Sequence, residues 1–218
     1  MFEHVDMQFN ELEVIQEDNK RWYVTPEGKQ YPSITTVLGH HKKHIIQEWR
    51  QRIGEKEANK ISTQASRRGT NVHKLCEDFI NNYEGYLGEH LPSNIELFNS
   101  ISEILNTNIT KVYGQEVPLY SDYLGVAGRT DCIADWNGRR AVIDFKTSSK
   151  TKKREWITDY FKQTTAYAIM FEERTGLPIT NLVIVIAVEN NRPQIFEGKR
   201  DDYVKSLKID IKEYADAT

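Results

Sequence analysis

The chain contains little cysteine: Cys76 and Cys132 are the two cysteines among its 218 residues. A four-thiolate zinc site or an iron–sulfur cluster needs more thiolates than this, so both kinds of centre are excluded. Each cysteine lies in an apolar stretch, which is typical of a small buried side chain in a reducing compartment. We therefore expect two buried free thiols and no iron–sulfur cluster.

Long apolar runs and an excess of positive charge are also missing. No stretch approaches the roughly 20 apolar residues of a membrane-spanning helix, so we expect no membrane partner. The acidic N-terminal segment has no apolar core and no Arg/Ser-rich amphipathic pattern, so we expect neither a secretory nor a transit signal. A formal net charge of −3 argues against a broad coat of nucleic acid, so any nucleic-acid contact has to be local.

The chain has 39% hydrophobic and 28% charged residues, which is typical of a globular protein, and its length favours one domain. Its patterns run from short strands to helices, then to a β-meander, a helix, a strand and a helix. This order predicts an α/β fold with a mixed sheet packed between helices. The expected elements are strands within 12–24 and 28–31; helices at 33–39, 45–60, 63–82 and from 92; strands at 111–120, 125–136 and 139–147; a helix at 155–173; strands at 182–189 and 194–196; and a helix from 201.

Residues 128–146, GRTDCIADWNGRRAVIDFK, predict two strands joined by a tight turn. Asn137-Gly138 is a preferred central pair of a two-residue type I′ hairpin, because both positions need positive φ. With these two residues as the loop, Asp131 falls opposite Asp144, and Lys146 shares their face. The same register pairs Trp136 with Arg139, Ala134 with Ala141, and Cys132 with Ile143.

Two opposed carboxylates of this kind repel each other, because their Cβ atoms lie only about 5 Å apart. A divalent metal between Asp131 and Asp144 would relieve the repulsion, with Lys146 as a second positive group. Such charges also occur on solvated edge hairpins. Here, however, the flanking residues are mostly apolar, and a carboxylate in an apolar strand needs a ligand or hydrogen bonds. The hairpin therefore predicts a divalent-metal site.

Three further groups are ambiguous from spacing alone. His73 and Glu77 lie on one helix face and both are suitable ligands for Mn²⁺-type ions, although the same spacing is common for surface pairs. Gln163 and Tyr167 also share a helix face, where core packing of the tyrosine explains the spacing equally well. Glu116 lies in a predicted strand, where a solvent-facing glutamate is ordinary.

Basic residues are concentrated in a few short segments. Such runs are usually solvated loops. The longest one leaves directly from the predicted metal site, which favours contact with a phosphate backbone. We predict phosphate-backbone contacts from Arg67, Arg68, Lys150, Lys152, Lys153 and Arg154.

The order of these residues resembles the PD-(D/E)xK nuclease superfamily, in its RecB-type exonuclease branch. That branch typically carries a GxxxH helix, a GxxD strand, a DxK strand and a QxxxY helix. Within that branch the chain resembles phage exonucleases and the mitochondrial genome maintenance exonuclease, which share a PS-[IV]-T-type segment. The matching segments here are Pro32–Thr35, Gly69–His73, Gly128–Asp131, Asp144–Lys146 and Gln163–Tyr167.

This resemblance implies a restriction-endonuclease-like α/β core, with a mixed β-sheet flanked by helices and an N-terminal helical extension. The expected single nuclease domain covers 1–218, with a hairpin and helical wall up to about 110 and a catalytic core from about 111. The implied activity is a Mg²⁺- or Mn²⁺-dependent exonuclease acting on free ends of single-stranded DNA, in the cytoplasm of a bacterium or phage-infected cell. A structure-selective endonuclease and a nuclease-like DNA-binding recombination subunit remain alternatives, and protein partners stay open.

The resemblance also implies roles for individual residues. Tyr167 would line the DNA path, Lys146 would polarise the attacking water or the phosphate, and Gln163 would orient Lys146 or the phosphate. The implied catalytic set is Asp131, Asp144, Lys146 and Gln163. The implied metal ligands are His73, Glu116, Asp131, Asp144 and the main-chain carbonyl of Phe145. Separately, the size of the helical region 45–108 indicates a wall or arch over the active site that admits a strand but not a duplex.

Overall fold

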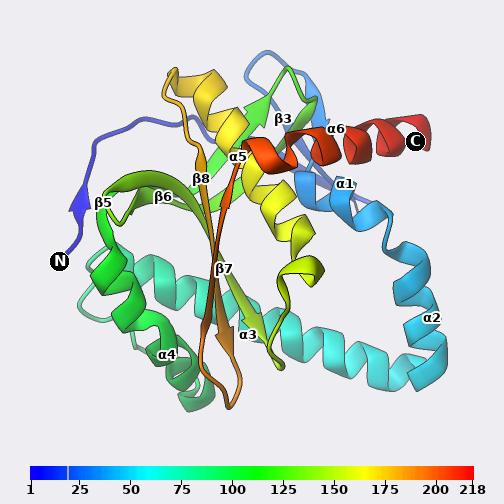
Figure 1. Ribbon diagram of the computed structural model, residues 1–218. Coiled ribbons are helices and arrows are strands. Elements are labelled where there is room, and N and C mark those ends of the chain that lie inside the picture. The colour runs from blue at the N-terminus through cyan, green and yellow to red at the C-terminus, as the bar shows by residue number, and fades with distance from the viewer. Residues whose placement is uncertain (19) are drawn as a thin grey trace.

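A six-stranded mixed sheet forms the centre of the computed structural model, which describes residues 1–18 and 20–218 (Figure 1). Its strand order is β1-β5-β6-β7-β8-β9. Strands β5, β6 and β7 form the predicted antiparallel meander, whereas β8 pairs with β7 in parallel and β9 pairs with β8 antiparallel. The strands are β1 (Glu3–His4), β5 (Ile109–Ser121), β6 (Val126–Trp136), β7 (Arg139–Ser148), β8 (Asn181–Val188) and β9 (Gln194–Lys199).

Helices cover both faces of this sheet, as the α/β prediction requires. The helix α5 (Thr158–Thr175) makes the parallel crossover from β7 to β8, and α6 (Asp201–Asp216) packs beside it. The other face carries α3 (Glu55–Ile80) and α4 (Pro92–Asn108). Successive β7 residues face opposite cores, since Val142 packs with the α5 cluster and Ile143 with the α3–α4 cluster.

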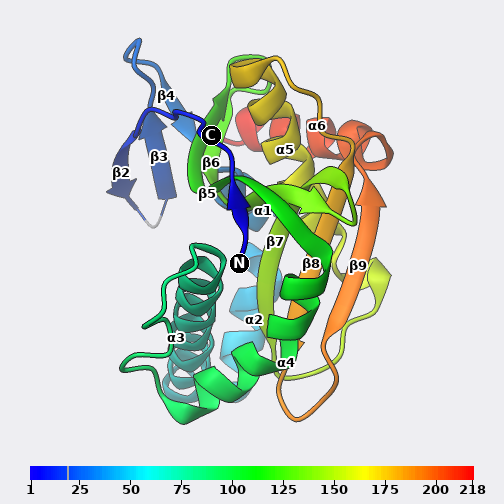
Figure 2. The same cartoon turned by 90° about the vertical axis from the view of Figure 1, so that its left-hand side faces the viewer.

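A second, three-stranded antiparallel sheet precedes the helices. It consists of β2 (Glu13–Glu17), β3 (Lys20–Val24) and β4 (Gln30–Pro32), and it leads into α1 (Ile34–His40). The predicted helix start at Ser33 is confirmed, because its hydroxyl accepts a hydrogen bond from the Thr36 amide at 3.0 Å. Figure 2 shows this small sheet and α3 on the same side of the large sheet.

The helix boundaries between residues 43 and 80 differ from the prediction. The helix α2 (Lys43–Ile53) ends at Gly54, whose φ of 87° a residue with a side chain rarely adopts, and α3 then continues unbroken to Ile80. The sequence between 60 and 63 contains neither glycine nor proline, so nothing there interrupts the helix. The predicted boundary in that segment is therefore wrong.

Other boundaries follow local signals that the sequence does show. Gly176 adopts a left-handed conformation and ends α5, as its position before Leu177-Pro178 suggests. The predicted helix start at 155 is wrong, because a separate 3₁₀ turn, η1 (Arg154–Trp156), precedes α5. Strand β1 was not expected, since two residues carry no periodic pattern. No helix in the described part of the chain combines the length and apolar character needed to cross a membrane.

Candidate active site

The β6–β7 hairpin has the predicted turn and register. Asn137 and Gly138 both have positive φ, and the ladder runs from Trp136 opposite Arg139 to Cys132 opposite Ile143. The ladder ends at that last pair. The hairpin register predicted that Asp131 would pair with Asp144 as the next step of the ladder. The structure does not show this main-chain pair.

Asp131 instead meets β7 through its side chain. Its Oδ2 accepts a hydrogen bond from the Phe145 amide at 2.8 Å. Burial by itself would raise the pKa of Asp131, but the nearby His73 and Lys146 charges outweigh it and hold this pKa below its usual value. Asp131 is therefore held as a charged acceptor at the strand end.

Asp144 and Lys146 share one face of β7, as side-chain alternation predicts. Asp144 is 1% exposed, and its Oδ1 accepts a hydrogen bond from Lys146 Nζ at 2.6 Å. Burial raises the pKa of Asp144 to about 6, with Lys146 opposing the rise. Burial alone would lower the pKa of Lys146, but the two aspartates hold it above its usual value. The other carboxylate oxygen, Asp144 Oδ2, is buried without a hydrogen-bond partner in the described structure.

Glu116 is the residue that lies opposite Asp131 in the sheet. Gln115 pairs with Cys132 and Val117 with Thr130, so the intervening residues face each other across β5 and β6. Burial, followed by the charge of Asp131, raises the pKa of Glu116 to about 7. The pair of opposed carboxylates that the hairpin suggested therefore exists, but it joins β5 to β6.

His73 reaches this pair from α3. Its Nδ1 lies 3.5 Å from Asp131 Oδ1, and ligand atoms of His73, Glu116 and Asp131 all lie within 4.8 Å of one another. Burial would lower the pKa of His73, but Asp131 outweighs it and raises the pKa to about 9. The structure thus places three of the predicted metal ligands together, His73, Glu116 and Asp131. The fourth, Asp144, is bonded to Lys146 and lies close enough to Asp131 for that charge to affect its pKa.

These donors fit a hard divalent cation. Carboxylate oxygens are the preferred ligands of Mg²⁺ and Mn²⁺, and imidazole is a good ligand for Mn²⁺. A buried carboxylate oxygen without a partner, such as Asp144 Oδ2, is costly unless a cation or donor satisfies it. The ring of Phe145 packs in the α3–α4 core and lies edge-on to the His73 ring. A ligand role for its carbonyl stays a prediction.

A cleft of about 640 Å³ opens at two of these ligands, His73 and Glu116. Its walls come from α3, from β5 and β6 of the large sheet and from β3 of the small sheet, all of which Figure 2 labels. Arg21 and Arg129 add positive charge to it, and neither was predicted from the sequence. The Arg129 guanidinium donates to the Glu116 carbonyl at 2.5 Å, which ties the cleft wall to the ligand strand. Lining residues are Arg21, Gly69, Thr70, His73, Lys74, Glu77, Glu116 and Arg129.

The Gln163–Tyr167 pair has a different position from the one expected of a DNA contact. Tyr167 is 2% exposed, and Gln163 Nε2 donates to its hydroxyl at 3.4 Å. Its ring packs directly on Gly128, where an added Cβ would lie 2.8 Å from a ring carbon. The prediction that Tyr167 lines the DNA path is therefore corrected, because the structure makes it a core residue. Gln163 is half-buried, and its catalytic role stays a prediction.

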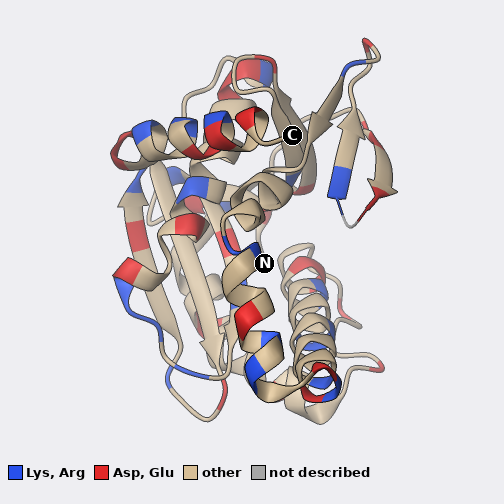
Figure 3. Cartoon of the chain, turned by 90° about the vertical axis from the view of Figure 1, so that its right-hand side faces the viewer, with Lys and Arg blue, Asp and Glu red and all other residues tan. Residues whose placement is uncertain are grey.

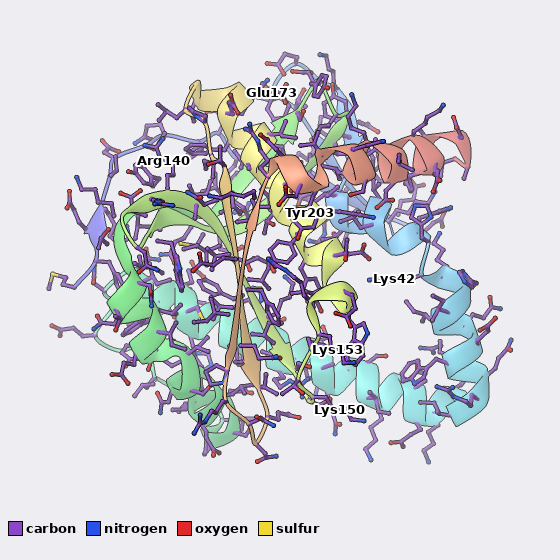
Figure 4. The ribbon with its side chains drawn as sticks, viewed as in Figure 1. Lys42, Arg140, Lys150, Lys153, Glu173 and Tyr203 are labelled. Atoms are coloured by element: carbon purple, nitrogen blue, oxygen red, sulfur yellow. The ribbon has the colours of Figure 1, made fainter. Side chains whose placement is uncertain are left out.

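The predicted DNA-contacting residues differ in how exposed they are and in whether they have partners. Arg68 and Arg154 have partners within the protein, since Arg68 pairs with Glu189 and Arg154 donates to the Glu197 carbonyl. Lys152 is half-buried, whereas Arg67, Lys150 and Lys153 are exposed. Figure 4 shows Lys150 and Lys153 on the connection from β7 to α5, far from Arg140 at the start of β7.

The chain was compared with known proteins. It is 27% identical over 173 residues to the mitochondrial genome maintenance exonuclease 1 of Mus musculus, which covers 74% of this chain and 51% of the relative. The Xenopus tropicalis protein of the same name is 26% identical over 175 residues, with 74% and 50% covered. The chain therefore spans about half the length of the curated relatives it matches.

A solved structure of a candidate exonuclease from Eubacterium rectale superposes with a TM-score of 0.46 and 13% identity, covering 69% of this chain and 66% of that one. The family model described as the PD-(D/E)XK nuclease superfamily matches residues 101–213, just over half of the chain. That span contains Asp131, Asp144 and Lys146. The chain belongs to the PD-(D/E)XK nuclease superfamily.

Proposed function

We propose that this chain is a Mg²⁺- or Mn²⁺-dependent deoxyribonuclease that hydrolyses phosphodiester bonds from the free ends of single-stranded DNA. The observation that carries the proposal is the environment of Asp144, which is buried with one oxygen on Lys146 and the other without a partner. A cation beside Asp144 Oδ2 would satisfy that oxygen. The names of the curated relatives, which are exonucleases, support the same reaction.

The chain's own residues have separate tasks in this reaction. Asp144 and Asp131 would hold the metal, with Glu116 and His73 completing its ligands. A bound divalent metal supplies Lewis-acid stabilisation of the phosphate and lowers the pKa of a bound water. Lys146 remains protonated beside Asp144 and would donate a hydrogen bond to the attacking water or to a phosphate oxygen. His73, which holds a proton at neutral pH without metal, must release it to act as a ligand.

A requirement for free ends is supported by the shape of the α2–α3 arm, residues 43–67. Among these residues, all of which the structure describes, only Ala58 is buried. Figure 1 shows α2 running away from the body and α3 returning beneath β7. Lys42, just before the arm, is tied to Asp159 of α5 by an ion pair of 2.5 Å. A strand that passes between the arm and α5 would have to enter from its end.

The test compares three substrates of identical sequence: linear single-stranded, linear double-stranded and covalently closed single-stranded DNA, each with Mg²⁺ and with Mn²⁺. We expect digestion of the linear single strand and resistance of the closed circle. Rapid cutting of circles would overturn the end requirement and favour the structure-selective endonuclease. Binding without cleavage of any substrate would favour the nuclease-like binding subunit.

A further inference from the structure

Trp156 is an aromatic side chain that the site described above does not use. It lies on η1, between the β7 residues of the site and α5, and it is 60% exposed. Tryptophan is strongly buried on average, so a tryptophan left this exposed calls for a reason. Its indole offers a large flat surface on the connection that leaves the catalytic strand.

The position of Trp156 is fixed by its neighbours rather than by its own packing. Its amide donates to the Lys153 carbonyl at 3.0 Å, and the next residue, Ile157, is 1% exposed. Arg154 holds the other side of the turn, because its guanidinium lies 4.8 Å from the Phe161 ring and bonds to the Glu197 carbonyl. The ring is therefore presented to solvent by a well-anchored turn.

The turn adjoins both the site and exposed positive charge. Lys146 Nζ lies 5.3 Å from the ring centroid of Tyr160, which is four residues after Trp156 in the first turn of α5. Lys153 Nζ lies over the Trp156 ring, 5.3 Å from the ring centroid. Figure 4 shows that Lys150 and Lys153 come from the same connection. Proteins that bind single-stranded nucleic acids combine aromatic faces with exposed cations, because the bases stack on the rings while the phosphates pair with the cations.

We propose that Trp156 is a stacking platform for a base of the single-stranded substrate, with Lys153 at a neighbouring phosphate. This inference rests on the proposed function, since it assigns a binding position to the strand that enters the site. It places an aromatic side chain on the DNA path, a role that the family resemblance implied for Tyr167. Stacking on a flat ring tolerates any base, so the platform favours unpaired bases without selecting their sequence.

Tyr123 provides a matched control. It is 65% exposed and has a lysine over its ring, with Lys208 Nζ at 5.0 Å, so it shares both local features of Trp156. Its amide bonds to Glu173, at the far end of α5. Figure 4 shows Glu173 and Lys153 well apart. Tyr123 is a phenol and Lys208 also donates to its hydroxyl at 2.9 Å, but the difference that the control uses is its distance from the site.

The experiment measures binding of an oligothymidine, and of the same strand with abasic positions, in an Asp144→Asn background without metal. Adding Trp156→Ala should weaken binding of the base-carrying strand about ten-fold, at an unchanged salt slope, and leave abasic binding unaltered. Trp156→Phe should retain most of the affinity, and Tyr123→Ala should change nothing.

Equal binding by Trp156→Ala and its parent, or equal losses on the base-carrying and abasic strands, would overturn the inference. So would an equal loss in Tyr123→Ala. Metal-dependent cleavage by the unmodified chain tests the proposed function separately. An inactive chain that still showed base-dependent binding through Trp156 would overturn that function and leave the platform standing.

Discussion

At the scale of single residues, the ion pair between Asp144 and Lys146 leaves one carboxylate oxygen of Asp144 free to bind a metal ion. Lys146 occupies only Oδ1, and burial raises the pKa of the carboxyl to about 6 while Oδ2 stays unpartnered. The choice of Asp131 and Asp144 as candidate ligands, and the shared face of Asp144 and Lys146, could be predicted from the hairpin. Side-chain alternation and a two-residue turn depend only on neighbouring residues. The capture of the Phe145 amide by Asp131 could not be predicted, since it depends on where the ladder ends.

His73 should determine which metal the chain prefers. An imidazole ligand favours Mn²⁺ over Mg²⁺, so His73→Ala should shift the ratio of Mn²⁺- to Mg²⁺-supported cleavage several-fold towards Mg²⁺ while lowering both rates. Rates measured across titrations of each metal would show this shift. His90→Ala is a suitable control, because His90 bonds to Asn71 and is not among the ligands. Unchanged rates with both metals would make His73 a helix-surface residue.

The pH dependence of the metal-free protein follows from three raised pKa values. Those of Asp144, Glu116 and His73 are about 6, about 7 and about 9, each above its ordinary value. Each group binds its proton more tightly in the folded than in the unfolded chain, so the free energy of unfolding falls as pH rises from its ordinary pKa to its folded-state pKa. The melting temperature in EDTA should therefore fall from about pH 4 to pH 9, through the two carboxyls below pH 7 and through His73 above it.

Metal binding should show the opposite trend, because the ligands must lose their protons first. The stabilisation produced by a fixed Mn²⁺ concentration should therefore grow from pH 6 to 9. Glu116→Gln should remove the part of both changes that lies near pH 7. Melting temperatures that stay level with pH, with or without Mn²⁺, would contradict these raised pKa values.

Gly128 of the GxxD strand and Gly69 of the GxxxH helix differ in how much space they leave for a side chain. At Gly128 on β6, a Cβ would lie 2.8 Å from the buried Tyr167 ring, so Gly128→Ala should destabilise the fold by about 1–3 kcal/mol. At Gly69 inside α3, the nearest atom to such a Cβ is Thr147 Oγ1 at 3.9 Å. Alanine there should be neutral or stabilise by up to about 1 kcal/mol.

Urea unfolding of both variants checks this difference. Equal stabilities of Gly128→Ala and the unmodified chain would show that the Tyr167 contact is not tight. A stable Gly69→Ala protein that no longer cleaves DNA would show that substrate, rather than the sheet, needs the open space beside α3.

The elements also show how far sequence reasoning reaches. The β6–β7 hairpin and the Ser33 cap were predictable because each depends on a few adjacent residues. The position of Glu116 opposite Asp131 was not, because two irregularities between Ile109 and Gly114 shift the β5–β6 register. The full length of α3 was missed because the prediction placed the helix boundary between residues 60 and 63. In the structure Gly54 separates α2 from α3.

Charge over the whole molecule is mixed rather than one-sided. Figure 3 shows acidic and basic segments interspersed along α2 and α6, in keeping with a net charge of −3. DNA affinity should therefore depend on a few local cations. Lys150→Gln with Lys153→Gln should reduce the salt slope of binding by up to about 1.4 units, at roughly 0.7 for each lost single-strand phosphate contact.

Binding isotherms from low to physiological salt would measure that slope. Lys205→Gln, a neutralisation on the exposed face of α6, is the matched control and should leave it unchanged. An unaltered slope in the double variant would place the phosphate path elsewhere.

The most direct test of the account is nucleotide release from uniformly labelled linear single-stranded DNA with saturating Mg²⁺ or Mn²⁺. The unmodified chain is compared with Asp131→Asn, Asp144→Asn and Lys146→Ala. Asp135→Asn is the control, since Asp135 lies on the same strand and face as Asp131 but bonds to Tyr113. We predict losses of about 10³-fold or more in each of the three and near-normal release by Asp135→Asn. Near-normal release by any two of the three, or release by the unmodified chain in EDTA, would contradict the metal-dependent site.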